Sequence, residues 1–387
     1  MTAGRSTTDR AALRASVAEF VRREIAPNLQ VWEDTGEIPR ELHLKAAEQG
    51  LLGIGFPEHV GGEGGDLADT VAVQEAFFEA GASSGLMAGL FTGGIALPHI
   101  AASGNADLVD RFVRPTLAGE TIGALAVTEP GGGSDVAGLR TAAELIRGSD
   151  GASYYLVNGA KTFITSGVRA DFVTTAVRTG GPGHAGVSLL VVEKGTPGFT
   201  ADRSLAKMGW HCSDTAELSY VDVRVPVANL VGEQDSGFYQ IAAQFVVERI
   251  ALAVHAYGIA ARSLSLTAAY CRGRETFGKP LIANQVVQHR LVEMHRQVEV
   301  ARAYTHAVVE RHLAGHDVIA DAALAKQTAV DASTYVCDQA VQLHGGTGYM
   351  HGTEVERHYR DARILPIGGG ATEVLTDLAA TLLGYTS

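Results

Sequence analysis

The chain has 387 residues, of which 46% are hydrophobic and 19% are charged, as in an ordinary globular protein. Its formal net charge is −12 at pH 7 and it has no long run of Lys or Arg, which disfavours nucleic acid and anionic membrane surfaces as partners. Three widely spaced cysteines indicate neither a disulfide framework nor a metal site, so we expect a cytoplasmic protein without a metal.

Residues 1–121 are expected to form a helical domain. Apolar residues recur with a period near 3.6 from Leu13 to Ile25, and Asp9 stands before that run as a candidate N-cap. Pro27 should end this first helix. The apolar stretch 84–102 contains four glycines, which indicate either close helix packing or space for a ligand tail.

Near residue 122 the apolar period changes from 3.6 to 2, which is typical of strands. The predicted strands are Ile122–Thr128, Tyr154–Val157, Lys161–Thr165, Asp171–Val177, Val187–Val192 and Ala216–Val223. Because no long helix separates them, they indicate an antiparallel sheet or barrel and not βαβ units. We assign residues 122–231 to this middle domain.

Helical spacing resumes after Ser236, and four segments, 238–272, 284–313, 317–343 and 371–383, predict a bundle over residues 232–387. The expected fold class is therefore α+β and mostly α. It comprises an N-terminal helical domain, a middle antiparallel β-barrel domain and a C-terminal four-helix bundle. No apolar run approaches the ~20 residues that span a bilayer, so we expect no membrane partner.

One acidic residue falls on the apolar face of the first bundle helix. At 3.6 residues per turn, Glu248 shares that face with Ile241, Phe245 and Leu252. A carboxylate buried there without a partner would have a pKa raised above its ordinary value of about 4.3, as a general base requires. The alternative is that Arg249 or another cation pairs with Glu248 and makes it structural.

A glycine-rich turn follows the first predicted strand, in the sequence Val127-Thr-Glu-Pro-Gly-Gly-Gly-Ser-Asp135. Its backbone N–H groups can converge on an anion or a ring carbonyl, and the hydroxyl groups of Thr128 and Ser134 add donors. It lacks the Gly-x-Gly-x-x-Gly pattern of a Rossmann site and the Gly-Lys-Ser/Thr of a P-loop. The alternative is a plain tight turn.

Two further segments combine groups that suit a nucleotide. Arg272–Pro280 contains arginines, which match a pyrophosphate, and Phe277, whose ring can pack on a flat heterocycle. Gln342–Tyr349 offers backbone amides at a helix end. The charged segment Glu356–Ile364 by itself indicates a solvated or intersubunit helix face.

Together these motifs resemble the acyl-CoA dehydrogenase family over nearly the whole chain. The resemblance is carried by residues 127–135, 158–167, 207–215, 274–278, 342–346 and 360–363, in this order and spacing. It implies an FAD enzyme of fatty acid metabolism (β-oxidation) that forms a homotetramer, a dimer of dimers, and passes electrons to an electron-transferring flavoprotein. It also implies that an acyl-CoA thioester becomes the trans-2-enoyl-CoA, with the β-hydride accepted at N5 of FAD.

The resemblance carries site residues onto particular positions of this sequence. The implied cofactor-binding residues are Val127, Thr128, Gly133, Ser134, Phe163, Thr165, Arg274, Phe277, Gln285, Gln342, Gly345, Gly346 and Glu373. The implied substrate-binding residues are Ser134, Arg249, Gly370, Met87 and Phe91. Of these, Arg274, Phe277 and Gln285 match a segment that reaches FAD in a neighbouring subunit.

One departure from the family pattern decides which residue is expected to be the base. Many members carry a catalytic Glu after Arg-Asp-Ala-Arg, in Ile-Tyr-Glu-Gly-Thr, but here that position is Gly369. The subset that resembles long-chain and isovaleryl-CoA dehydrogenases carries its base on the first bundle helix, where this chain has Glu248. Glu248 is therefore the expected base that removes the α-proton. A second departure, Ala371 in place of a Thr, removes one expected hydrogen bond to FAD.

Two other functions fit the same motifs. The first is an acyl-CoA oxidase or flavin monooxygenase on the same fold, and the second is a non-catalytic flavoprotein that binds acyl thioesters. The acyl chain is not specified by these residues, and neither is the choice between CoA and an acyl-carrier protein. The glycines near Met87 and Phe91 favour room for a medium, long or branched chain.

Overall fold

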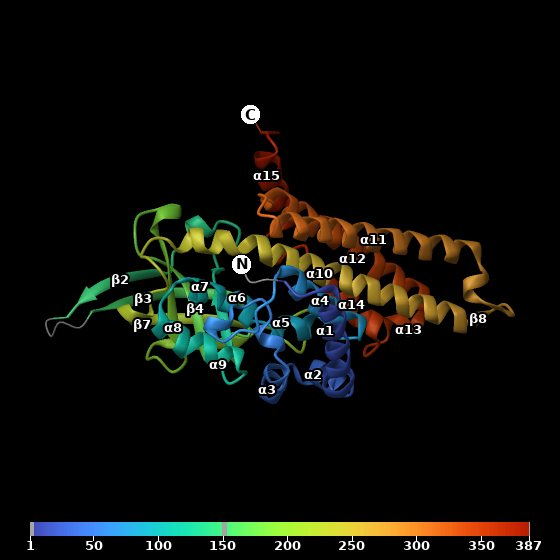
Figure 1. Ribbon diagram of the computed structural model, residues 1–387, viewed down its shortest axis with the longest axis horizontal. Helices are drawn as coiled ribbons and strands as arrows, with labels where there is room; N and C mark the ends of the chain where they lie inside the picture. Colours follow the sequence, from blue (N-terminus) through green and yellow to red (C-terminus); the bar gives the residue numbers. More distant parts are fainter. Residues whose placement is uncertain (1–3, 149–152, 387) are drawn as a thin grey trace.

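The computed structural model describes residues 4–148 and 153–386 (Figure 1). Its N-terminal part is helical, as predicted, and a π-helical turn, Val21–Ile25, extends the first helix. The helices are α1 (Thr7–Phe20), α2 (Leu29–Thr35), α3 (Arg40–Glu48), α4 (Leu67–Glu79), α5 (Ser84–Leu90), α6 (Gly93–Ala96), α7 (Pro98–Ala102), α8 (Ala106–Leu108) and α9 (Arg114–Leu117).

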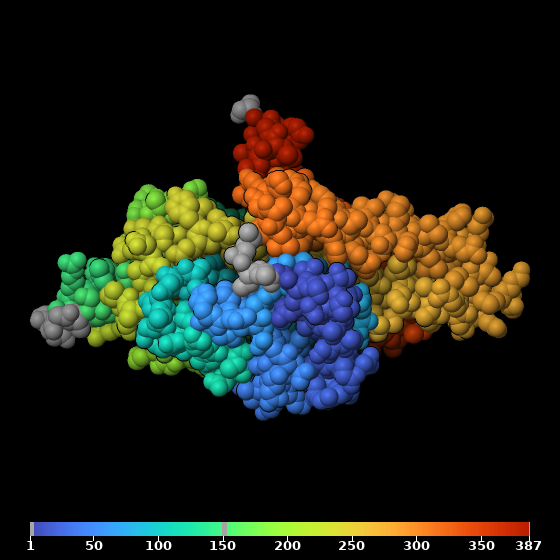
Figure 2. All heavy atoms as spheres, viewed as in Figure 1, coloured from blue at the N-terminus to red at the C-terminus, as the bar shows by residue number. Residues whose placement is uncertain are grey.

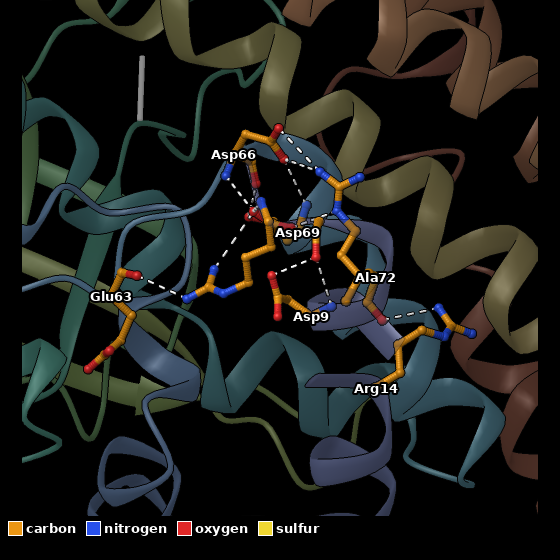
Figure 3. A network of polar contacts seen from close by, with 10 residues as sticks. Asp9, Arg14, Glu63, Asp66, Asp69 and Ala72 are labelled. Carbon is orange, nitrogen blue, oxygen red and sulfur yellow. Dashed lines mark hydrogen bonds and ion pairs between the residues drawn. The ribbon is translucent and has the colours of Figure 1, made fainter. Parts of the chain in front are cut away.

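A network of charges joins the start of α1 to the start of α4 (Figure 3). The predicted N-cap, Asp9, was wrong: Ser6 caps α1, and its Oγ accepts the N–H of Asp9 at 3.2 Å. Serine followed three residues later by an acid is itself a capping pattern, which places the helix start one turn earlier. Arg10 Nε donates to the buried Asp69 Oδ1 at 2.7 Å, and Asp69 forms a capping box with Asp66 at the start of α4.

The middle part of the chain forms one curled sheet with the strand order β1-β4-β2-β3-β7-β6, in which β5 pairs with β4. The strands are β1 (Gly123–Ala126), β2 (Ala142–Arg147), β3 (Ser153–Thr165), β4 (Phe172–Arg178), β5 (Val187–Glu193), β6 (Phe199–Ser204) and β7 (Thr215–Pro226). Pairing is mostly antiparallel, as predicted, but β1 runs parallel to β4. The start of β2 also meets the end of β4 in parallel, at Ala142 and Arg178.

Two strands were not predicted, and two predicted strands proved to be one. β3 joins Tyr154–Val157 to Lys161–Thr165 through irregularities in its pairing with β7. The missed strands, β2 and β6, are largely exposed and lack a clear apolar alternation. Their neighbours in the sheet hold them in place, so the tertiary pairing overrides a weak local signal.

The C-terminal part contains the four predicted long segments as α10, α11, α12 and α15. Its elements are α10 (Gly237–Gly273), β8 (Glu275–Thr276), β9 (Lys279–Pro280), α11 (Gln285–Leu313), α12 (Ile319–His344), α13 (Gly346–Tyr349), α14 (Glu354–Ala362) and α15 (Thr372–Leu382). The charged segment around α14 is not a solvated face, because His358 and Asp361 are fully buried.

The long helix α10 runs through the whole molecule, from the sheet to the hairpin β8–β9 at the far end (Figure 1). It is long and apolar enough to span a bilayer by length and composition, although 61% of its most apolar window is buried inside the protein. Core helices meet the same criterion. The helix α15 packs on α12 and projects from the body of the molecule (Figure 2).

Candidate active site

Glu248 lies in α10, with Phe245 and Leu252 about one turn away on either side. Its side chain is half-buried, and it forms no hydrogen bond or ion pair within residues 4–148 and 153–386. The alternative of a structural pair with Arg249 therefore fails. Burial raises the pKa of Glu248, and the charges of Arg249 and Lys326 offset only part of that rise.

Gly369 lies directly against this carboxylate. A Cβ atom built on Gly369 would stand 3.5 Å from Glu248 Oε1 and 2.2 Å from Leu252 Cδ1. The φ angle of Gly369 is +63°, a left-handed conformation that favours glycine. A side chain at position 369 and the carboxylate of Glu248 therefore point at the same space, although one comes from a loop and the other from a helix.

Arg249, the neighbour of Glu248, is also buried, with 8% of its surface exposed. Its guanidinium lies over the ring of Phe245, 5.2 Å from the centroid, and its buried Nε has no hydrogen-bond partner in the described part of the chain. Burial lowers the pKa of Arg249, against the attraction of Glu248. A buried guanidinium without a protein acceptor is suited to bind a polar group of a ligand.

The glycine-rich turn after β1 is held by a buried ion pair. Lys161 Nζ donates to Glu129 Oε1 at 2.9 Å and to the carbonyl oxygen of Val127 at 3.0 Å. Glu129 also accepts the backbone N–H groups of Arg140 and Thr141, at 2.7 and 2.8 Å. Burial alone would raise the pKa of Glu129, but these hydrogen bonds and the charge of Lys161 lower it to about 2.

This turn brings together the predicted residues of the sheet. Thr128 accepts the N–H of Thr162 through its carbonyl oxygen at 3.0 Å, which places it beside Phe163. Gly133 packs against Thr128, and Ser134 is exposed. The glycines before them, at positions 131 and 132, have nothing within 4 Å of an added Cβ, so a ligand can approach this backbone closely.

Phe163 is presented outward by an irregularity in β3. It is 68% exposed and has a φ angle of +60°, in the left-handed region that is strained for an aromatic residue. Strained, exposed residues of this kind are typical of ligand sites. Thr165 follows on the same strand, and its neighbour Ser166 is bonded through Oγ to Thr92 Oγ1 at 2.7 Å, which joins β3 to the region after α5.

A second group of predicted cofactor residues lies at the opposite end of α10 (Figure 1). Phe277, in the tip between β8 and β9, is fully exposed and has a φ angle of +51°. The ends of α10 and α12 meet there, because the rings of Tyr270 and His344 stack 4.3 Å apart. Exposed residues of this group are Arg274, Phe277, Gln285, Gln342, Gly345 and Gly346. A single chain therefore does not bring them to the turn after β1.

The remaining predicted residues lie in two further places. Glu373 is exposed in the first turn of α15, and the carbonyl oxygen of Gly370 lies just before that helix, bonded to Lys326. Met87 is 1% exposed within the main core. Phe91 is partly buried, packs edge-on against Phe77 at 5.3 Å and lines a cavity with room for about one water.

Sequence reasoning did not single out Lys326 or the pair Glu129–Lys161. Lys326 is 1% exposed on α12, and its Nζ donates to the carbonyl oxygens of Gly368 and Gly370 at 2.7 Å each. A signal was present: Lys326 falls among alanines that are spaced to lie on the buried face of a helix, including Ala322 and Ala329. No group of three or more His, Cys, Asp or Glu residues is placed to hold a metal ion in the described chain.

Comparison with known proteins shows the family of the chain. Family models match residues 7–120 (acyl-CoA dehydrogenase, N-terminal domain), 124–223 (middle domain) and 235–383 (C-terminal domain). The long-chain specific acyl-CoA dehydrogenase of Rattus norvegicus mitochondria is 39% identical over 373 residues, which cover 95% of this chain and 84% of that protein.

Solved structures are similar over almost the full length. A Mycobacterium smegmatis protein assigned as an acyl-CoA dehydrogenase is 61% identical, with a TM-score of 0.96 and 99% of both chains covered. The FAD complex of PigA is 25% identical, with a TM-score of 0.92 and 99% of both chains covered. The chain is therefore a member of the acyl-CoA dehydrogenase family.

Proposed function

We propose that this protein carries out FAD-dependent α,β-dehydrogenation of an acyl-CoA thioester to the trans-2-enoyl-CoA, with Glu248 as the base that takes the α-proton. The observation that carries this proposal is that Glu248 and Gly369 lie close together and face the same space. Position 369, where many family members carry their base, has no side chain here and faces Glu248. The carboxylate of Glu248 has no hydrogen-bond or ion-pair partner in the described residues.

The residues around the turn after β1 fit an FAD ring. The open glycines 131 and 132 allow close approach of a flat group, and the strained, exposed Phe163 offers a ring surface beside them. The hydroxyl groups of Thr128 and Thr165 have no protein partner in the residues that the structure covers, so both are free to donate to a ligand. When bound, FAD supplies the acceptor for the hydride from the β-carbon.

The chain's own residues prepare the α-proton for removal. Burial raises the pKa of Glu248, which brings its basicity closer to that needed for a general base near neutral pH. Phe245 and Leu252 on either side keep water from surrounding the carboxylate. Arg249, with its unpaired buried Nε, is suited to hold a polar part of the thioester substrate near the base.

The second group of cofactor residues supports a shared site between subunits. The hairpin β8–β9, which carries Phe277 at its tip, lies at the far end of α10 from the sheet (Figure 1). Thr128 is bonded to Thr162 in the sheet, so a neighbouring copy of the chain has to supply Phe277 if both residues contact the same FAD. A homotetramer, built as a dimer of dimers, meets this requirement. We also infer from the family that an electron-transferring flavoprotein reoxidises the enzyme.

Replacement of Glu248 by Gln tests the proposal directly. The amide keeps the size of the side chain but cannot take a proton, so we expect dehydrogenation to fall by about 10²–10⁴-fold while FAD and acyl-CoA still bind. Glu19→Gln, an exposed change in α1, serves as the control and should leave the rate unchanged. Near-normal activity of Glu248→Gln would refute its assignment as the base.

Anaerobic titration with acyl-CoA tests the reaction class. A dehydrogenase bleaches the flavin absorbance on addition of substrate, and absence of bleaching would contradict the proposal. Rapid recovery of the absorbance in air would favour the oxidase alternative. A panel of acyl-CoAs should show preference for medium, long or branched chains, and a clear preference for C4 would refute that expectation.

A further inference from the structure

The loop that replaces the family's usual base-bearing segment contains no side chains that would restrict its conformation. It consists of Gly368, Gly369 and Gly370, and the last two have φ angles of +63° and +99°. Glycine has more conformational freedom to lose than any other residue, so such a loop is costly to order. Its backbone is tied to its surroundings at Ile364 and Pro366, whose carbonyl oxygens accept the N–H groups of Gly368 and Thr372 at 2.8 and 3.1 Å.

Two residues of α12 attach this segment from another helix. Gln327 Nε2 donates to the carbonyl oxygen of Thr372 at 2.8 Å, and Lys326 binds the glycines themselves. Its Nζ donates to the carbonyl oxygens of Gly368 and Gly370, both at 2.7 Å, and so binds the loop on each side of Gly369. A lysine has three N–H donors, and the third has no protein acceptor in the described residues. Burial of an ammonium group without an ion-pair partner costs free energy, which the two hydrogen bonds to the loop offset in part.

Glu248 is the carboxylate that acts on this ammonium. The two groups are not in hydrogen-bond contact, but their charges interact: Glu248 raises the pKa of Lys326, which burial lowers to about 8. The other charge that acts on both is Arg249, beside Glu248 on α10. The loop at residues 368–370 contributes no charge, because all three residues are glycines.

We propose that Lys326 is a positioning residue for Glu248. Its two hydrogen bonds hold the glycine loop, and therefore the bare position 369, against the carboxylate, while its charge favours the ionised form of the base. This inference rests on the proposed function only in treating Glu248 as the base. The two hydrogen bonds of Lys326 to the loop, called the clamp below, do not depend on which reaction the protein carries out.

Hydrogen–deuterium exchange of the FAD-loaded, full-length protein tests the clamp without turnover. In Lys326→Met the two carbonyl oxygens lose their donor, and we expect the amides of residues 367–372 to exchange about tenfold faster. Lys45→Met, which removes an exposed lysine paired with Glu24, is the control and should leave this segment unchanged. Unchanged protection in Lys326→Met would overturn the clamp.

The pH dependence of kcat tests the effect on the base. The rate rises with pH as Glu248 loses its proton, and the positive charge of Lys326 lowers the pH at which this happens. In Lys326→Met the acid limb should therefore move up by about one pH unit, with the plateau at high pH largely kept and KM little changed. A uniform loss of kcat at every pH, with the limb in place, would contradict a positioning role.

Two more variants keep the test decisive if Lys326→Met does not fold. Lys326→Arg retains the charge and the donors and should keep the acid limb of the unmodified protein, whereas Lys326→Gln retains an N–H donor but loses the charge and should move it. Identical limbs in both would overturn the electrostatic part. If Glu248→Gln proves fully active, the proposed function fails, but the exchange result still decides whether Lys326 clamps the loop.

Discussion

Two buried lysines bind glycine-rich loops, and their charges are compensated in different ways. Lys161 binds the carbonyl oxygen of Val127 and is paired directly with Glu129 at 2.9 Å. Lys326 binds two loop carbonyl oxygens but has no carboxylate within ion-pair distance in the described residues. Burial lowers the pKa of each to about 8.

The difference indicates what each region does. The turn after β1 carries its own counter-ion, so its charges are neutralised inside the protein and it forms a rigid frame beside Phe163. The loop at Gly369 leaves its cation to act on Glu248 from a distance. The first region is thus built for stability, and the second keeps a charge available to the base.

Removal of Glu129 should have the largest effect on stability. Glu129→Ala leaves Lys161 buried without its carboxylate and the N–H groups of Arg140 and Thr141 without an acceptor, so we expect the free energy of unfolding to fall by about 3–5 kcal/mol. Denaturant unfolding measures this. Glu144→Ala, an exposed change in the same sheet, is the control, and an equal loss in both variants would contradict the difference between the regions.

The pH dependence of stability should also report the contribution of the Glu129–Lys161 pair. The pKa of Glu129 is lowered to about 2 in the folded protein, so its contribution is present above its unfolded pKa of about 4.3 and is lost as the pH falls towards 2. The free energy of unfolding of Glu129→Gln should therefore differ from that of the unmodified protein by up to roughly 3 kcal/mol at pH 7. This difference should shrink below pH 4. A constant difference would show that Glu129 does not titrate as proposed.

Single alanine substitutions in the two glycine loops should have smaller effects and should change different quantities, stability at one position and FAD affinity at the other. Gly369→Ala strains a left-handed position and meets Leu252, so we expect a loss of about 1–2 kcal/mol in stability with little change in FAD affinity. Gly132→Ala meets nothing in the protein, so stability should be unchanged while FAD binds more weakly. Denaturation and flavin fluorescence titration measure these effects. The same outcome at both positions would remove the distinction between the loops.

Local patterns predicted much of this architecture and failed at identifiable places. The helical, β, helical order and the long bundle segments follow from apolar periods, which the packed protein keeps. The strands β2 and β6 were missed because strands with largely exposed side chains carry little apolar pattern. The buried state of Asp361 was missed because a charged helix resembles a solvated face until its partners, the N–H groups of Trp210 and Gly85, are known.

The sequence by itself determined that position 369 has no side chain and that a carboxylate lies on an apolar helix face at position 248, because both are properties of single residues and their spacing. Only the tertiary structure decided that these two positions face each other, that Glu248 has no ion-pair partner among the described residues, and that Lys326 binds both sides of the loop. These are contacts between α10, α12 and a loop far apart in the chain, and they depend on helix packing that no local pattern encodes.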